Sequence, residues 1–108
     1  MSITSHPAIA AYFDSETRAD TEVFEQVFAP DATVTDEKQT HSGLEAIKAW
    51  RQAAKRKYQY TVEPLDSQIS DTGVVVRARL EGTFPGGTAV VTYTFGMQHG
   101  KIQTLEIR

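Results

Sequence analysis

The stretch that decides the fold is Phe28-Ala29-Pro30-Asp31-Ala32-Thr33-Val34-Thr35-Asp36. Apolar residues at helical spacing lead into it, and they are Val23, Phe24, Val27 and Phe28. We expect Pro30 to end that helix, because proline has no backbone N–H to donate and its ring clashes with the preceding turn. After the proline, Ala32, Val34 and Asp36 share one face of a strand, since side chains two residues apart point the same way. The sequence therefore predicts a short strand that ends in a carboxylate.

Two helices are predicted before this strand. The first spans His6 to Arg18, with Ser5 as its cap and Pro7 in its first turn. The second begins near Asp20 or Thr21, because either side chain can cap it.

A third helix is predicted after the strand. Ser42-Gly43-Leu44-Glu45 has the Ser-x-x-Glu form of a capping box, which marks the start of a helix. The buried stripe of this helix consists of Leu44, Ile47, Trp50 and Ala54. The helix closes in Lys55-Arg56-Lys57, and we interpret these cations as complements of the helix dipole.

From Tyr58 onward the pattern changes to the two-residue period of strands. Four strands are predicted, near residues 58–69, 74–84, 88–97 and 101–108. Turn residues separate them at Asp71-Thr72-Gly73, Pro85-Gly86-Gly87 and His99-Gly100. Because these turns are short, consecutive strands should pair antiparallel as a meander.

The faces of this sheet differ in polarity. One face of the second of these strands is apolar and carries Val74, Val76, Ala78 and Leu80. The opposite, outer face of the sheet is expected to carry Val91, Tyr93, Phe95, Arg77 and Arg79. Such a mixture of aromatic and charged residues is typical of interfaces, so we expect a homodimer through the outer sheet face, with Arg77, Arg79 and Glu81 as its ion pairs.

Length and composition limit the possible functions. The 108 residues, of which 40% are hydrophobic, suffice for one domain over residues 1–108. Without cysteine there is no disulfide framework and no thiolate nucleophile. A net charge of -3 argues against nucleic-acid binding, and the chain has neither a long apolar run nor a basic-then-apolar leader. We expect a cytoplasmic protein that binds neither nucleic acid nor membrane.

Motifs for metals and cofactors are missing from the sequence. His6, His41 and His99 lie on separate loops or termini, and the predicted cap at Ser42 interrupts the spacing of His41 and Glu45. There is no phosphate loop, dinucleotide fingerprint or Gly-x-Ser-x-Gly elbow. We therefore expect no metal and no cofactor.

Three features of the chain resemble the nuclear transport factor 2-like superfamily, in its SnoaL-like and ketosteroid-isomerase-like branch. They are the order of the predicted elements, the stretch Phe28-Ala29-Pro30-Asp31-Ala32-Thr33-Val34-Thr35-Asp36, and the stretch Ser-Gly-Leu-Glu-Ala-Ile-Lys-Ala-Trp over 42–50. This resemblance covers nearly the whole chain. It implies an α+β fold, a cone-shaped α+β barrel in which three N-terminal helices pack on a curved antiparallel sheet around a pocket. It also implies that the protein is a dimer.

The resemblance also suggests site residues. Asp36 falls where ketosteroid isomerases keep the aspartate that removes a proton beside a ketone, and Tyr12 falls where they keep a tyrosine that donates to the enolate oxygen. The match then ends. Thr92 stands where those enzymes have a second, protonated aspartate, and Phe28 and Arg51 stand where they have two supporting tyrosines. Thr92 therefore argues against an efficient steroid isomerase.

Asp36 and Tyr12 are the residue types that proton abstraction beside a carbonyl requires, a base and an oxyanion donor. An aspartate is a weak base in water, so it needs an apolar pocket. The residues expected to line this pocket and bind substrate are Phe24, Phe28, Trp50, Tyr60, Val76, Ala78, Thr92 and Leu105, with Leu80 and Ile107 as further wall candidates. The ligand expected there is a small hydrophobic molecule.

Three functions stay open at this point. The first is a cofactor-independent isomerase or cyclase that acts on a hydrophobic ketone or polyketide-like molecule through Asp36. The second is a ligand-binding or dimerisation domain without catalysis, for which Asp36 need not be desolvated. The third is an epoxide hydrolase or dehydratase, which needs a second carboxylate or a histidine in the cavity, from Glu63 or His41.

Overall fold

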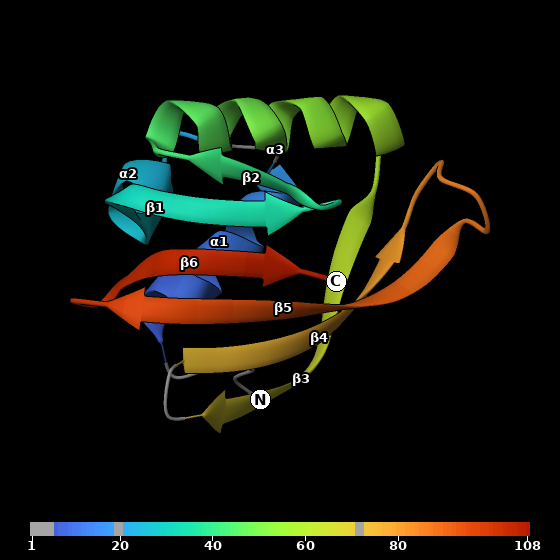
Figure 1. Ribbon diagram of the computed structural model, residues 1–108. Coiled ribbons are helices and arrows are strands. Elements are labelled where there is room, and N and C mark those ends of the chain that lie inside the picture. The colour runs from blue at the N-terminus through green and yellow to red at the C-terminus, as the bar shows by residue number, and fades with distance from the viewer. Residues whose placement is uncertain (1–5, 19–20, 71–72) are drawn as a thin grey trace.

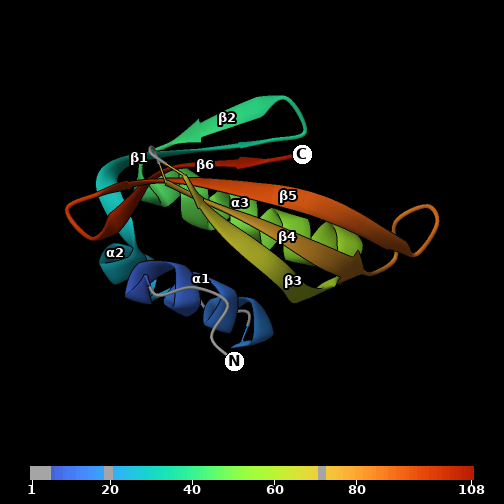
Figure 2. The same ribbon diagram turned by 90° about the horizontal axis from the view of Figure 1, so that it is seen from below.

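Three helices pack against one curved, six-stranded sheet in the computed structural model, which describes residues 6–18, 21–70 and 73–108 (Figures 1 and 2). The helices are α1 (Pro7–Arg18), α2 (Phe24–Val27) and α3 (Leu44–Tyr58). The strands are β1 (Phe28–Asp36), β2 (Gln39–Ser42), β3 (Thr61–Ser70), β4 (Gly73–Glu81), β5 (Thr88–Gln98) and β6 (Lys101–Ile107). In this part of the chain no helix is long and apolar enough to cross a membrane.

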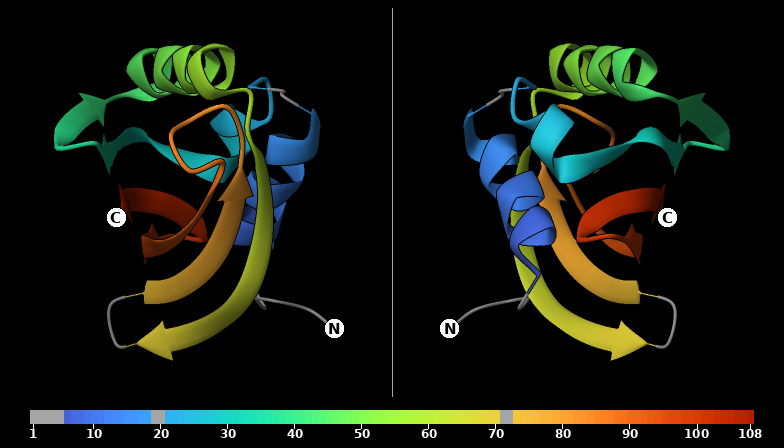
Figure 3. Two further views of the ribbon diagram at one scale, coloured as in Figure 1. Left: turned by 90° about the vertical axis from the view of Figure 1, so that its right-hand side faces the viewer. Right: turned by 90° about the vertical axis from the view of Figure 1, so that its left-hand side faces the viewer.

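The strand order is β2-β1-β6-β5-β4-β3, and the sheet curls around the helices (Figure 3). The four C-terminal strands form the predicted antiparallel meander, although β3 begins only at Thr61 because α3 continues to Tyr58. β1 extends the meander by pairing parallel with β6, with Val34 opposite Leu105 and Asp36 opposite Ile107. The sheet is therefore mixed, and not antiparallel throughout as expected.

The helix predicted from Asp20 or Thr21 to Pro30 is shorter than expected. α2 is a single turn that ends at Val27, no side chain caps it, and Phe28 already has extended backbone angles. Pro30 did not end a helix but lies within β1, where the register against β6 shifts between Phe28 and Thr33, so its missing N–H disturbs no regular ladder. Ser5 and Asp20, the other predicted caps, lie outside the described residues.

β2 was not predicted. Glu37 and Lys38 both have positive φ angles, of 53° and 66°, and form the two-residue turn of a hairpin in which Asp36 faces Gln39. Such turns are usually signalled by Asn or Gly, and Glu-Lys gives no such signal. The hairpin fixes the direction in which Asp36 leaves the end of β1.

The start of α3 differs from the predicted capping box. Ser42 is the last residue of β2 and pairs with Thr33, while Gly43 takes the cap position with φ of 88° and no side-chain hydrogen bond caps the helix. Gly43 donates its N–H to Ala32 and accepts a hydrogen bond from Ile47. The glycine backbone, not the serine hydroxyl, therefore joins strand and helix.

The outer face of the sheet is mainly polar, although Val90 is exposed there opposite Arg79. Tyr93 and Phe95 lie opposite Val76 and Val74 on the inner face, in the core, so the prediction that they form an outer dimer surface with Val91 is wrong. On the outer face, Arg77 pairs with Asp66 and Arg79 with Glu63, both within the same chain. The surface expected to form the homodimer interface thus lacks the aromatic residues assigned to it, and the homodimer stays a prediction.

Gly43 and Ser42 give a test of this helix start. We expect Gly43→Ala to lower the free energy of unfolding by about 1–3 kcal/mol, because an alanine is strained at this φ although its Cβ would meet no neighbour. Ser42→Ala should change it by less than about 0.5 kcal/mol, because the exposed hydroxyl caps nothing. Urea unfolding of both variants measures this, and the reverse order of effects would restore the capping box.

Candidate functional site

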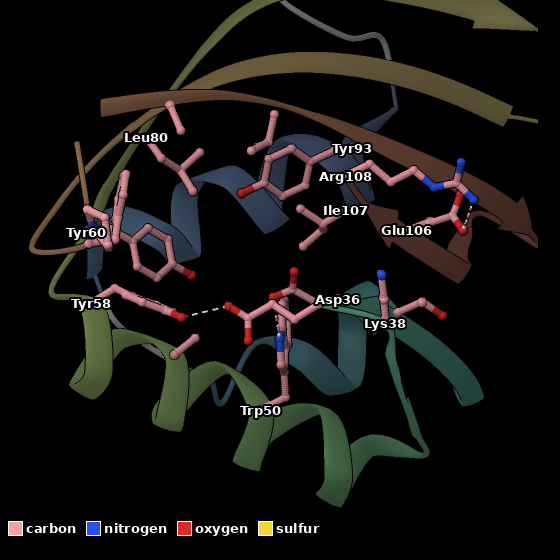
Figure 4. A pocket seen from close by; sticks show the side chains of 17 residues that line it. Asp36, Lys38, Trp50, Tyr58, Tyr60, Leu80, Tyr93, Glu106, Ile107 and Arg108 are labelled. Carbon is pink, nitrogen blue, oxygen red and sulfur yellow. Dashed lines mark hydrogen bonds and ion pairs between the residues drawn. The ribbon is translucent and has the colours of Figure 1, made fainter. Parts of the chain in front are cut away.

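A cavity of about 680 Å³ lies between α3, the inner face of the sheet and the loop that joins β4 to β5 (Figure 4). Its walls are mainly aromatic and aliphatic: Trp50, Ala54, Tyr58, Tyr60, Leu80, Phe84, Pro85, Ala89, Val91, Tyr93 and Ile107. Its polar residues are Thr35, Asp36, Glu37, Lys38, Glu106 and Arg108. A cavity of this size and composition accommodates a small, mostly apolar molecule.

Asp36 reaches the cavity from the end of β1 (Figure 4). Trp50 comes from the inner face of α3, one turn after Ile47, and its indole Nε1 donates a hydrogen bond to Asp36 Oδ2 at 3.1 Å. Both residues are placed by elements whose apolar faces are buried, so the carboxylate and the indole are held by the fold and not by a free loop.

Burial of its side chain raises the pKa of Asp36 above the ordinary value of an aspartate. The Trp50 hydrogen bond opposes this increase, the neighbouring Glu37 charge adds to it, and His41 opposes it. Desolvation is the largest of these effects, so the Asp36 carboxyl has a raised pKa. A carboxylate that acts as a base requires a raised pKa, whereas a residue that only binds a ligand does not.

Three tyrosines present their rings to the cavity. Tyr58 donates its hydroxyl to Glu37 Oε1 at 2.7 Å, so that donor is already used (Figure 4). Tyr60 and Tyr93 project from the far walls, and burial is the main reason that the pKa of each is raised. The nearby Glu16 charge adds to the increase in the pKa of Tyr60. Both hydroxyl groups therefore keep their protons at neutral pH.

The mouth of the cavity is charged. Glu37 and Lys38 come from the β1–β2 turn, and Glu106 and Arg108 from the end of β6, where Arg108 Nη2 lies 3.0 Å from Glu106 Oε2. Apart from Asp36, the charged side chains of the cavity lining thus come from two segments, the β1–β2 turn and the end of β6.

Three of the predicted site residues line the cavity together: Asp36, Trp50 and Tyr60. The further wall candidates Leu80 and Ile107 line it as well. Five others are buried in the core outside the cavity lining, and these are Phe24, Phe28, Val76, Ala78 and Leu105. Thr92 lies opposite Arg77 on the outer face of the sheet, so it does not belong to the pocket, and its neighbour Tyr93 faces inward instead.

Tyr12 does not line the cavity either. It is fully buried among Phe13, Phe24, Phe28, Tyr93 and Phe95, and its hydroxyl has no hydrogen-bond partner among the described residues. α1 packs Tyr12 into the core, so the hydroxyl that was expected to donate to a substrate oxygen does not reach the cavity.

Sequence reasoning missed Tyr58, Phe84 and Tyr93 as cavity residues. Tyr93 could have been found from register, because it alternates with Thr92 and shares a face with Val91. Tyr58 and Phe84 gave no comparable signal, since one ends a helix and the other lies in a loop.

The residues considered for a second acid or base lie outside this cavity. Glu63 pairs with Arg79 on the outer sheet face. His41 borders a smaller hollow of about 200 Å³ on the other side of Asp36, with its ring 6.2 Å from that of Trp50. Among the described residues no group of three or more histidine, aspartate or glutamate side chains could hold a metal ion.

A family model for the SnoaL-like domain matches residues 9–104 of the chain. The chain belongs to the SnoaL-like domain family. A candidate polyketide cyclase from Sinorhizobium meliloti is similar in structure, with 40% identity and a TM-score of 0.90 over 94% of this chain and 93% of that one. No curated protein matches at the significance required.

Two more distant structures share the fold of this SnoaL-like domain. A ketosteroid-isomerase-like protein from Catenulispora acidiphila, in complex with trimethylamine, is 17% identical with a TM-score of 0.84 over 97% of this chain and 86% of that one. A Mycobacterium tuberculosis protein, in complex with estradiol-17beta-hemisuccinate, is 16% identical with a TM-score of 0.77 over 93% and 88%. The likeness to the Catenulispora acidiphila structure confirms the predicted α+β, ketosteroid-isomerase-like fold.

The burial of Tyr12 leads to a prediction about stability. Tyr12→Phe should leave the free energy of unfolding unchanged or raise it by up to about 1 kcal/mol, because it removes a buried hydroxyl that makes no hydrogen bond. Tyr12→Ala should lower it by about 3–5 kcal/mol through loss of the ring. Chemical denaturation of the two variants measures both effects. A loss of more than about 1.5 kcal/mol in Tyr12→Phe would show that the hydroxyl has a partner.

Proposed function

We propose that this SnoaL-like protein is a proton-transfer enzyme of the isomerase or cyclase type, which acts on a hydrophobic ketone or polyketide-like molecule. The observation that carries the proposal is the Asp36 carboxylate, which lies half-buried in an apolar cavity with its pKa raised by burial. A base of this kind removes a proton beside a carbonyl more effectively than an aspartate in water.

In this mechanism the substrate lies with its carbonyl toward the far walls of the cavity and its acidic carbon toward Asp36. As the proton leaves, negative charge accumulates on the carbonyl oxygen, and a hydrogen-bond donor must meet it. Tyr60 and Tyr93 are the hydroxyl donors in the cavity wall whose protons are retained, and they replace Tyr12 in this role. In an isomerisation the protonated Asp36 then returns its proton to another carbon of the enolate. In a ring closure the enolate carbon instead attacks a second carbonyl of the substrate, and the proton goes to the alkoxide oxygen that this attack produces.

The relatives support the substrate class. The Sinorhizobium meliloti structure, at 40% identity, is that of a candidate polyketide cyclase, and the Mycobacterium tuberculosis relative is bound to a steroid derivative. Both names describe hydrophobic molecules that carry oxygen, in keeping with an apolar cavity whose few donors are hydroxyl groups.

Hydrogen–deuterium exchange tests the proposal without knowledge of the natural substrate. We expect the protein to accelerate exchange of the protons beside the carbonyl of 2-tetralone in D₂O, followed by proton NMR. Asp36→Asn should reduce this acceleration by about 10²-fold or more, because the amide cannot accept the proton. The rate should fall as pH is lowered through the raised pKa of Asp36, since only the ionised carboxylate is a base.

Asp31→Asn is the matched control, because Asp31 lies exposed on the same strand and outside the cavity. It should keep the exchange rate of the unaltered protein. Binding of 2-tetralone without accelerated exchange would contradict the enzyme and support a ligand-binding domain instead. Equal exchange by Asp36→Asn and the unaltered protein would remove Asp36 as the base.

A further inference from the structure

Three charged side chains form a buried cluster between α1 and α3, next to the cavity. Glu16 of α1 lies between Arg51 and Lys55 of α3, with its Oε2 3.4 Å from Arg51 Nη2 and its Oε1 3.0 Å from Lys55 Nζ. The side chains of Glu16 and Arg51 are each only 1% exposed, and that of Lys55 is 16% exposed. Arg51 also donates to Ser15 Oγ at 3.0 Å.

Stability alone does not explain this cluster. Buried ion pairs rarely stabilise a protein more than well-packed apolar residues of the same size, because removal of the charges from water is costly. Arg51 occupies a position on α3 directly after Trp50, where an apolar side chain could pack against Tyr12 and Phe24. We therefore expect a role of the cluster besides stability, and the contacts of Lys55 indicate that role.

Lys55 joins the cluster to the cavity residue Tyr60 by two contacts. Lys55 Nζ donates to the backbone carbonyl of Tyr60 at 2.9 Å and lies 3.9 Å from the centre of the Tyr60 ring. Tyr60 needs such support, because it stands between the left-handed Gln59 that ends α3 and the first paired residue of β3, Thr61. Tyr93, in contrast, is held by the hydrogen-bonded ladder of β5 with its neighbours.

We infer that Glu16, Arg51 and Lys55 are positioning residues that hold Tyr60 at the cavity wall, so that its hydroxyl donates a hydrogen bond to the carbonyl oxygen of the ligand. This inference rests on the proposed function, since it takes a ketone as the ligand. Glu16 aligns Lys55, Arg51 aligns Glu16, and Lys55 fixes both the backbone and the ring of Tyr60. The cluster thereby couples α1, which contributes nothing to the cavity lining, to the recognition of the ligand's oxygen.

A pair of matched compounds tests the inference through binding alone. 2-Tetralone has a carbonyl oxygen, and tetralin has the same carbon skeleton without it, so the ratio of their dissociation constants measures recognition of the oxygen. The indole N–H signal of Trp50, the only tryptophan of the chain, reports binding of either compound by NMR. We expect the unaltered protein to prefer the ketone by about tenfold, the range of one hydrogen bond.

Lys55→Met should reduce this preference to about twofold or less while the affinity for tetralin changes by less than about twofold. Tyr60→Phe should produce the same loss, because it removes the hydroxyl itself. Lys55→Arg, which keeps a cation, should retain the preference. Lys48→Met is the matched control on the same helix, because Lys48 lies near the exposed Glu25 and outside the cavity lining. Glu16→Gln gives a second test should Lys55→Met prove unstable.

Each result decides the matter. Absence of a ketone preference in the unaltered protein, or an undiminished preference in Tyr60→Phe, would overturn Tyr60 as the donor. An undiminished preference in Lys55→Met, or equal losses for ketone and hydrocarbon, would show that the cluster only stabilises the fold. Binding does not require proton abstraction, so the two proposals can fail separately. If the unaltered protein does not accelerate proton exchange but still prefers the ketone, and Asp36→Asn keeps that preference, the catalytic proposal fails and this inference stands.

Discussion

The desolvation of Asp36 is the constraint on which the site depends. The carboxylate stands at the last residue of β1, where the β1–β2 turn directs it under α3, and Trp50 covers it while donating a single hydrogen bond. The cavity walls, the β1–β2 hairpin and α3 together bury the Asp36 carboxyl group, which therefore binds a proton more readily than a free aspartate does.

The polar groups around the cavity are divided between two sides. On the side of β1, Trp50 donates a hydrogen bond to the half-buried Asp36 carboxylate, which is the proposed base. On the opposite side lie Tyr60 and Tyr93, the proposed hydroxyl donors, and the buried charges of α1 and α3 lie behind Tyr60. Proton abstraction beside a carbonyl requires a base and a donor on two sides of the substrate, which is why we assign these roles. The SnoaL-like fold supplies the space, and these few side chains determine what the space can do.

The sequence predicted the fold better than the site, for physical reasons. Two-residue alternation identified β3 to β6, and helical spacing identified α1 and α3, because burial of one face imposes a period on the residues. Asp36, Trp50 and Tyr60 were correctly predicted to line the cavity, because each lies within or next to a strongly patterned element. Thr92 was assigned to the pocket wrongly, since a shift of one residue in β5 moves a side chain to the other face. Tyr12 and the partners of Arg51 depend on how α1 packs across the sheet, which no local pattern encodes.

A carbon-detected NMR titration of the Asp36 side-chain carboxyl in the unliganded protein measures directly whether this group is desolvated. We expect a pKa clearly above about 3.9, the value of an aspartate in water, because burial outweighs the Trp50 hydrogen bond. A pKa at or below that value would mean that the carboxylate is solvated or stabilised by its hydrogen bonds. It would contradict the assignment of Asp36 as a poised base and leave ligand binding as the function of the cavity.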